Sequence, residues 1–319
     1  MTTEVAVHPL ISPWGRFGLY SFLIDAPELA IVDTGIASSP AKGMAPALEA
    51  LGRNIDDVQW IFLTHGHIDH LGGAYALWEL TGRRAKVVIS EADAPLLRSR
   101  RAHVDEYLLG RAQYLNDPDG EARQAASAAA VISGEMEPHL IVGGGETISL
   151  GGDVTVSVHA VPGHTAGAVA YVIDGQDSVF VGDAVQSYGA ANGFPGYESP
   201  MEYRASLEYL RDDIRPRHLY LGHPYRRADG TAFGVELDSH EAAEALQGSL
   251  DNESRINAAV QRYLADSPQV TDSPYSPFAA VAEELGYTGD PALEPSPFFT
   301  TMHGYLSTFT PKQNQNQEL

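Results

Sequence analysis

The chain has 319 residues, with 20 basic and 42 acidic side chains, and it carries a formal net charge of −22. This acidity disfavours nucleic-acid partners, and the short basic groups at 83–86, 98–101 and 226–227 are predicted to be solvated surface. The chain has no cysteine, which excludes disulfides and thiolate ligands. No apolar run approaches the roughly 20 residues that span a bilayer, and the first residues do not resemble a secretory leader. We therefore expect a cytoplasmic protein without membrane partners.

Short runs rich in Val, Ile, Leu, Phe and Tyr, taken in chain order, predict a series of buried strands. The predicted strands are 17–24, 29–33, 60–63, 86–90, 153–161, 168–173, 178–182 and 218–222. Two helices are predicted among the early strands, at 39–51 and 69–80. Pro46 weakens the helical pattern in the middle of the first one.

Two segments stand outside this strand-rich framework. Residues 91–145 are predicted to be a helical insertion with a break at 117–120. Its apolar residues, which fit either a lid over a site or a packed insertion, are Tyr107, Leu108, Leu109, Tyr114 and Leu115. Residues 238–319 are predicted to be a helical C-terminal extension, and its amphipathic helices are a possible homodimer surface.

The segment 64–70, Thr-His-Gly-His-Ile-Asp-His, gathers potential metal ligands directly after the apolar run 60–63. Imidazole nitrogens and carboxylate oxygens are good ligands for zinc and iron. His65 and His67 alternate, so they can point the same way from an extended segment, while Asp69 and His70 can reach a neighbouring position. Four potential ligands exceed what a catalytic zinc usually takes from a protein, because such a site keeps a position open for water. The surplus predicts two metals.

Three later residues of the same chemical kind each follow a predicted strand and stand beside a glycine. They are His164, Asp183 and His223, next to Gly163, Gly182 and Gly222. Loops at the ends of buried strands commonly carry catalytic groups, and glycine allows the backbone to approach a metal closely. Each of the three therefore stands where a sheet can present a catalytic group.

The segment 64–70 resembles the HxHxDH signature of the metallo-β-lactamase superfamily, and the later motifs follow that family's order over about residues 15–225. The resemblance implies an α/β fold of the αββα sandwich type, with a catalytic domain at 1–237 that contains the insertion at about 91–145. It also implies two divalent metal ions, with zinc favoured over iron or manganese. The implied ligands are His65, His67 and His164 for the first metal, Asp69, His70 and His223 for the second, and Asp183 as a bridge.

The resemblance further implies a hydrolase in which water between two metals becomes a metal-bridging hydroxide. Asp183 and the absence of cysteine make the chain more similar to lactonases and hydroxyacylglutathione hydrolases than to true β-lactamases. We therefore expect hydrolysis of a carboxylic ester, lactone or thioester, with phosphodiester hydrolysis or iron-dependent redox chemistry as alternatives.

Other residues have predicted roles around this centre. Asp69 and Asp183 are the expected catalytic carboxylates. Tyr188 resembles a substrate-facing tyrosine of some lactonases in the superfamily, so it is either a donor to the developing oxyanion or an ordinary packed side chain. Tyr225 and Arg226 fit either a substrate contact or the rim of the site, and Asp33 is predicted to orient a ligand histidine. The apolar helical faces of the insertion and the extension favour a small-molecule substrate that is uncharged or partly apolar.

Overall fold

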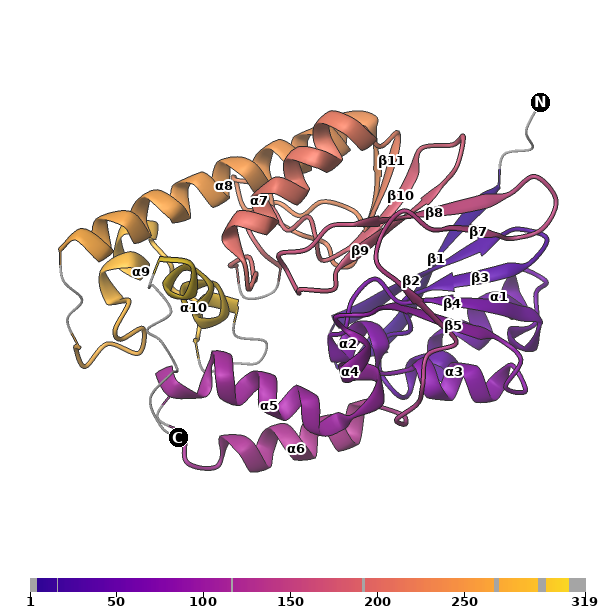
Figure 1. The fold of residues 1–319 in the computed structure, drawn as a ribbon, viewed down its shortest axis with the longest axis horizontal. Coiled ribbons are helices and arrows are strands. Elements are labelled where there is room, and N and C mark those ends of the chain that lie inside the picture. The colour runs from indigo at the N-terminus through magenta and orange to yellow at the C-terminus, as the bar shows by residue number, and fades with distance from the viewer. Residues whose placement is uncertain are drawn as a thin grey trace, which may run out of the picture.

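Two six-stranded sheets form the centre of the protein (Figure 1). The structure is a computed structural model, and it describes residues 5–15, 17–115, 117–190, 193–266, 270–291 and 297–309. The last residues of the predicted C-terminal extension, 310–319, lie outside the described part of the chain.

The first sheet has the order β1-β2-β3-β4-β5-β6. Its strands are β1 (Ala6–Trp14), β2 (Phe17–Asp25), β3 (Leu29–Val32), β4 (Val58–Phe62), β5 (Lys86–Ser90) and β6 (Leu140–Val142). The first three strands run antiparallel, and the pairs from β3 to β6 run parallel. The carboxyl ends of β3, β4 and β5 therefore meet at one edge of the sheet, as the strand-end motifs require.

The second sheet has the order β12-β11-β10-β9-β8-β7. Its strands are β7 (Thr147–Ser149), β8 (Thr155–Ala160), β9 (Val169–Ile173), β10 (Ser178–Gly182), β11 (His218–Leu221) and β12 (Glu236–Asp238). The pair β10 and β11 is parallel, and the other pairs are antiparallel. The residues that follow β10 and β11 thus leave the sheet side by side.

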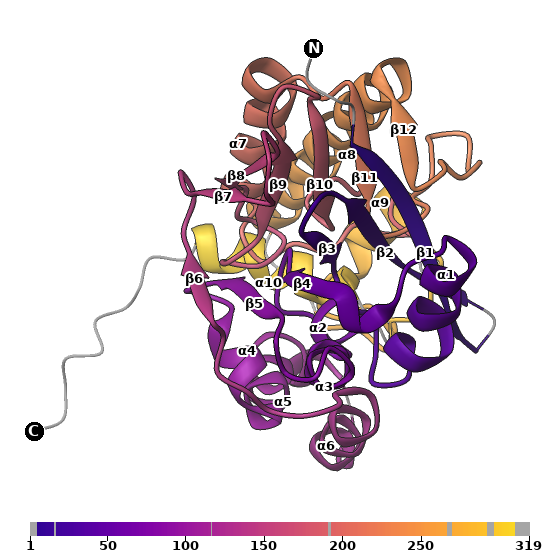
Figure 2. The same cartoon turned by 90° about the vertical axis from the view of Figure 1, so that its right-hand side faces the viewer.

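The helices cover the outer faces of both sheets, which gives the predicted αββα sandwich (Figure 2). They are α1 (Ala45–Ala50), α2 (Ile68–Leu71), α3 (Ala74–Leu80), α4 (Ala94–Arg98), α5 (Arg100–Gly110), α6 (Gly120–Val131), α7 (Pro200–Tyr209), α8 (Ser239–Ala265), α9 (Ala279–Leu285) and α10 (Pro297–Phe309). Helices α1, α3 and α4 share a buried core with the first sheet, and α7 to α10 share one with the second.

A third core fills the space between the sheets and is rich in aromatic rings. The rings of Phe62 and Tyr171 stack across the two sheets with centroids 4.8 Å apart. Phe180 and Tyr220 stack within the second sheet at 4.6 Å. Offset stacking of this kind contributes about 0.5–1.5 kcal/mol per pair beyond the burial of area. This packing fixes the two sheets, and hence their strand ends, relative to each other.

The predicted helix at 69–80 is interrupted, which the sequence pattern did not predict. Helix α2 ends at Leu71 and α3 begins at Ala74, with a break at Gly72 and Gly73. A β-carbon on Gly73 would lie 2.3 Å from the carbonyl oxygen of Thr34, so this backbone packs too closely for any side chain. Close packing after β3 therefore overrides the continuous helical pattern.

In the predicted helix at 39–51, Pro46 lies in the first turn of α1, after a π-helical turn at Pro40–Met44.

The helical insertion is shorter than predicted. Its helices end at Val131, and β6 then extends the first sheet, so the prediction of helical structure was wrong for the residues after α6. The predicted lid residues do not share one open face. Tyr107 is buried, Leu109 is exposed, and Tyr114 stacks on Phe299 of α10. The apolar side chain of Tyr114 therefore packs the insertion against the C-terminal helices. The expectation of an uncharged substrate rested mainly on an apolar lid, so it loses its main basis.

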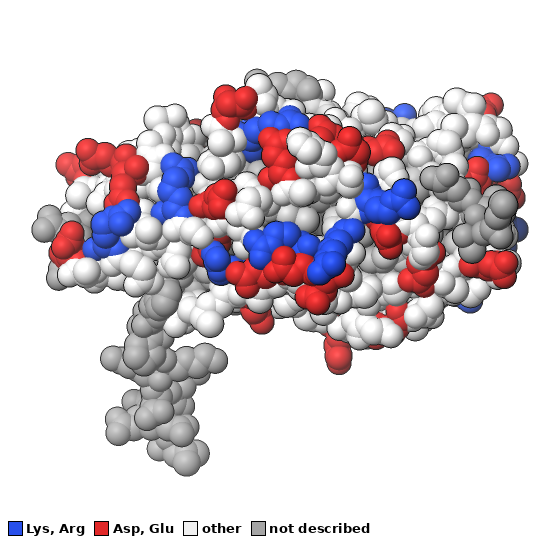
Figure 3. Space-filling view, turned by 90° about the horizontal axis from the view of Figure 1, so that it is seen from above, with Lys and Arg blue, Asp and Glu red and all other residues white. Residues whose placement is uncertain are grey.

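The basic groups singled out in the sequence are largely paired with carboxylates. Arg98 pairs with Glu137, Arg101 pairs with Asp105, and Arg227 pairs with Glu241 and Glu244. Figure 3 shows basic and acidic side chains intermingled on the face that α7 and α8 form. The absence of nucleic-acid partners stays a prediction.

Within the described ranges, no helix is both long enough and apolar enough to cross a membrane.

Candidate metal centre

The strand ends bring the predicted ligands together from both sheets. His65 and His67 lie in the turn after β4, and the short helix α2 carries the next two candidates. His164 lies in the loop between β8 and β9, while Asp183 and His223 follow β10 and β11. Residues that are far apart in the sequence therefore meet at one edge of the sandwich.

The first group consists of His65, His67 and His164, whose potential ligand atoms lie within 4.8 Å of one another. The Nδ1 atom of His67 lies 2.9 Å from Nε2 of His164. Burial lowers the pKa of His65 well below its usual value, and burial with the neighbouring His67 lowers the pKa of His164 to about 4. A low pKa keeps these two imidazoles neutral, which is the form that binds a metal, whereas the pKa of His67 in the same group is raised.

The second group consists of Asp69, His70 and His223, again with potential ligand atoms within 4.8 Å. Nε2 of His223 lies 3.1 Å from Oδ2 of Asp69. The Oδ2 atom of Asp183 lies 3.5 Å from Nε2 of His223 and 3.7 Å from Nε2 of His164. Asp183 thus stands between the two groups, which is where a bridging carboxylate belongs.

Three buried atoms of this cluster have no hydrogen-bond partner among the described residues: Nε2 of His65, Nε2 of His70 and Oδ1 of Asp183. Buried polar atoms in proteins are almost always paired, because an unpaired one costs about 1–3 kcal/mol. Here Nε2 of His70 and Oδ1 of Asp183 lie 3.4 Å apart without forming a hydrogen bond, and His65 groups with them, so a divalent cation would satisfy the three atoms together. The residues present therefore fit a metal.

The ring nitrogens that point away from the cluster are held by the protein. Nδ1 of His70 lies 2.8 Å from Oδ2 of Asp33, as predicted, and Asp33 also accepts from the backbone N–H of Thr64. Nδ1 of His164 donates to the carbonyl oxygen of Gly196 at 2.6 Å. Such outer contacts fix the orientation of a ligand histidine and raise its affinity for the metal.

Two glycines predicted to permit close approach do so. A β-carbon on Gly222 would lie 2.2 Å from Oδ1 of Asp183, and one on Gly182 would lie 2.3 Å from Oγ1 of Thr64. Gly182 also has a φ of +50°, which side-chain-bearing residues rarely adopt. Any larger residue at either position would push the candidate ligands apart.

Asp93, which the sequence analysis missed, ties two ligand loops together. Its carboxylate accepts from the backbone N–H of Gly66 at 2.7 Å, the hydroxyl of Thr165 at 2.7 Å and the backbone N–H of Gly167 at 2.9 Å. Gly66 lies between His65 and His67 in the sequence. A single aspartate in a segment predicted to be helical gave no signal of this contact, which depends on the packing of the two sheets.

The insertion also reaches the centre through a residue that the sequence did not single out. Oε1 of Glu106, on α5, lies 3.4 Å from Nε2 of His67. Burial acts to lower the pKa of His67, but the carboxylates of Glu106, Asp69 and Glu198 together outweigh it and raise that pKa to about 9. The carboxylate of Glu198 also lies near His67 and Glu106. The contact that the insertion makes with the candidate ligands is therefore through a carboxylate.

The two candidate tyrosines occupy different environments. The guanidinium of Arg255 lies 5.8 Å from the ring centroid of Tyr188, and the Tyr188 N–H donates to the carbonyl oxygen of Arg226. Tyr225 is buried, with its ring centroid 5.9 Å from that of His223. Burial, followed by the neighbouring Asp183 carboxylate, raises the pKa of the Tyr225 hydroxyl well above its usual value. Tyr225 therefore presents its phenol to the cluster, whereas the contact found for the Tyr188 ring is with α8.

Comparison with known proteins agrees with this geometry. The family model described as the metallo-beta-lactamase superfamily matches residues 14–223, which contain every candidate ligand. The chain belongs to the metallo-β-lactamase superfamily. A superfamily member from Rhodopseudomonas palustris (strain BisA53), named hydroxyacylglutathione hydrolase, is 31% identical over 227 residues, which are 70% of each chain. A protein of the same name from Acidiphilium cryptum (strain JF-5) is 29% identical over 257 residues, covering 80% of this chain and 84% of the relative.

A solved superfamily structure extends the likeness of the fold to nearly the whole chain. The metallo-beta-lactamase family protein from Thermus thermophilus is similar with a TM-score of 0.63 and 22% identity, and the match covers 95% of this chain and 93% of the other. Together with the family match, this shows a metallo-β-lactamase fold with C-terminal helices and a metal-dependent hydrolase. The domain boundary at 237 and the individual ligand roles stay predictions.

Proposed function

We propose that the protein hydrolyses a carboxylic thioester, ester or lactone at a two-metal centre. The observation that carries the proposal is the set of orphaned, buried atoms of His65, His70 and Asp183, which converge where the two ligand groups meet. Thioesters lead the three substrate classes because curated relatives at about 30% identity are named hydroxyacylglutathione hydrolase.

The proposed metal ligands are those predicted from the sequence. His65, His67 and His164 would hold the first metal, and Asp69, His70 and His223 the second, with Asp183 between them. Zinc is the proposed metal, and iron and manganese suit the same ligand types. When bound, such a pair of metals activates water and polarises the carbonyl of the substrate.

The chain's own residues then have distinct tasks. Asp33 and the carbonyl of Gly196 hold His70 and His164 in the orientation that aims their free nitrogens into the cluster. Asp69 is the second expected catalytic carboxylate and contacts His223, and Asp183 keeps the two ligand groups together. Tyr188 is the oxyanion donor predicted from the resemblance, and Tyr225 is a second candidate because its phenol lies beside Asp183.

The reaction breaks one bond to the acyl carbon. The oxygen of water bonds to the carbonyl carbon, the C–S or C–O bond breaks with its electron pair, and the leaving thiol or alcohol takes a proton. The products are a carboxylic acid and a thiol or alcohol. No serine or cysteine nucleophile is needed for this sequence of steps, and the chain has no cysteine to supply one.

A substrate panel on metal-loaded protein tests the proposal. Thioesters, esters, lactones and phosphodiesters with matched chromogenic leaving groups are compared by kcat/KM. We expect turnover of at least one acyl substrate, lost on chelation and restored by zinc or manganese. Turnover confined to phosphodiesters would favour the alternative hydrolase, and iron retained with no hydrolysis at all would favour redox chemistry.

A further inference from the structure

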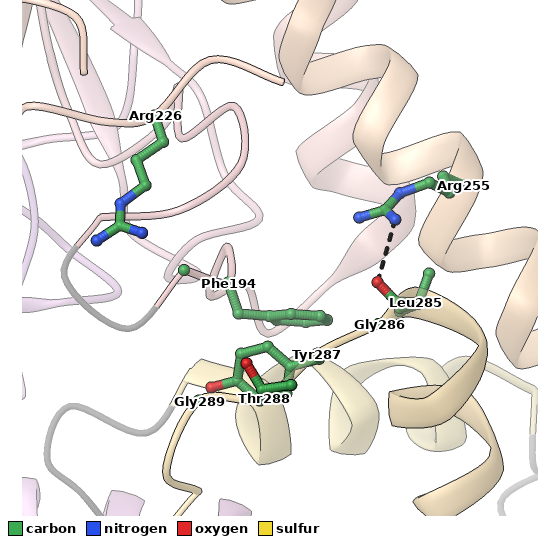
Figure 4. A pocket seen from close by; sticks show the side chains of 9 residues that line it. Phe194, Arg226, Arg255, Leu285, Gly286, Tyr287, Thr288 and Gly289 are labelled. Carbon is green, nitrogen blue, oxygen red and sulfur yellow. Dashed lines mark hydrogen bonds between the residues drawn. The ribbon is translucent and has the colours of Figure 1, made fainter. Parts of the chain in front are cut away.

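A cavity of about 330 Å³ lies between the loop before α7, helix α8 and the end of α9 (Figure 4). Its lining includes Phe194, Arg226, Arg255, Leu285 and Tyr287. This volume is at the lower end of the range for small-molecule sites, which suits a small organic ligand or one arm of a larger one.

Two guanidinium groups border the cavity without a carboxylate partner. Arg255 donates to neutral acceptors, the side-chain oxygen of Asn252 and the carbonyl oxygen of Leu285. Arg226 is exposed, and in the part of the chain that the structure describes neither arginine forms an ion pair. Nearby arginines outside the cavity, such as Arg227 and Arg262, do pair with glutamates.

The wall between the two arginines is aromatic and rigid. The rings of Phe194 and Tyr287 meet edge to face with centroids 5.0 Å apart, and Tyr287 stacks on Phe298 at 5.1 Å. Figure 4 shows Arg226 and Arg255 reaching toward the space above Phe194 from opposite sides. Cationic groups on either side of a flat apolar floor recognise an anion whose carbon skeleton packs on the rings.

The cavity is built from the same loops that carry the metal ligands. Arg226 closely follows His223, and Phe194 closely precedes Gly196, whose carbonyl oxygen accepts from His164. The other walls come from α8 and α9, which belong to the predicted C-terminal extension. The extension thus completes a cavity whose other walls come from loops that also carry or support candidate metal ligands.

We infer that Arg226 and Arg255 form a binding site for a carboxylate or phosphate group. Guanidinium groups bind both anions through paired N–H donors, so the shared chemistry is a small organic anion. The anion has two possible sources. It is either an arm of the substrate, in which case this inference rests on the proposed function, or a separate ligand that binds the C-terminal helices.

Binding of inorganic phosphate to the metal-loaded protein tests the site itself. Arg226→Gln, Arg255→Gln and the double variant are compared by calorimetry with Arg262→Gln, a control on α8 whose arginine pairs with Glu284 outside the cavity. Any phosphate that binds at the metals is expected in every variant alike, so it cancels in the comparison. We expect the double variant to lose an arginine-dependent binding event, with affinity lower by at least ~10-fold, and Arg262→Gln to match the parent. Equal phosphate binding by the parent and the double variant would overturn the inference.

Kinetics with two thioesters distinguish the sources of the anion. Both share one acyl group, and only one has a carboxylate on its thiol arm. A rise in KM of the double variant for the carboxylate-bearing thioester alone identifies a substrate arm. Unchanged KM values together with weakened phosphate binding identify a separate ligand. If no thioester, ester or lactone is turned over, the proposed function fails, and the phosphate titration still decides whether the anion site exists.

Discussion

The Nε2 atom of His67 lies 3.4 Å from Oε1 of Glu106, which links a candidate metal ligand to the helical insertion. The Nδ1 atom of the same ring faces His164 across the first ligand group. Glu106 is therefore placed to hold the His67 ring in its coordinating orientation.

Replacing Glu106 with Gln should weaken binding of the first metal, because a neutral amide orients an imidazole less strongly than a carboxylate. The expected loss of affinity is ~10-fold, at the lower end of what removal of such outer partners causes. Competition with a chromogenic chelator measures this directly. Glu121→Gln is the matched control, since Glu121 lies on α6 of the same insertion and pairs with Arg101. Equal metal affinity in the parent and Glu106→Gln would show that the contact does not position the ligand.

Asp93 should contribute strongly to stability. Asp93→Ala leaves the N–H groups of Gly66 and Gly167 and the hydroxyl of Thr165 without their acceptor in a buried place. The expected loss is about 2–5 kcal/mol in the free energy of unfolding, measured with denaturant. Asp105→Ala, which removes only an exposed ion pair, should cost less than about 1 kcal/mol. A similar small loss in both variants would mean that Asp93 does not join the ligand loops.

Two phenylalanine variants separate the roles of the tyrosines. Tyr225→Phe removes the phenol beside Asp183 and should lower kcat by ~10- to 100-fold, as loss of a transition-state donor does. Tyr188→Phe retains the ring that packs by Arg255 and should have the smaller effect. Both are measured on the best substrate of the panel at full metal occupancy. A larger loss for Tyr188→Phe would return the donor role to Tyr188.

Much of the fold was predictable because buried strands leave a local pattern. The apolar runs that end at the ligands, such as 178–182 before Asp183, coincide with strands. The strands that were missed are β1, β6, β7 and β12, and three of these are only three residues long. A short edge strand buries little apolar surface, so it has no run of apolar residues to reveal it.

The ligands were predictable for a different reason, namely that their chemistry and spacing are concentrated in short motifs. The residues that hold the ligands in position could not be predicted from the sequence. Asp93 and Glu106 contact the ligand loops only after the sheets and the insertion have packed, and nothing around them in the sequence differs from ordinary surface carboxylates. The break at Gly72 depends likewise on a close backbone contact with the carbonyl oxygens of Ile68 and Val131.

Asp183→Asn tests the bridging carboxylate. The change keeps the shape of the side chain and removes its charge, so one of the two ligand groups should bind its metal more weakly. We expect a loss of at least ~100-fold in turnover or in affinity for one metal. Asp177→Asn, a change in an exposed turn before β10, provides the control. Near-normal activity of a fully metallated Asp183→Asn protein would remove Asp183 from the centre.

The metal content of the purified protein tests whether the centre holds two metals. Protein stripped with a chelator, reloaded with excess zinc and freed of loosely bound metal is analysed by mass spectrometry against protein concentration. Because His65, His70 and Asp183 leave unpaired atoms in a cluster built from two ligand groups, we predict about two tightly bound metals per chain, each required for full hydrolysis. At most one tightly bound metal under saturating conditions would contradict the two-metal centre.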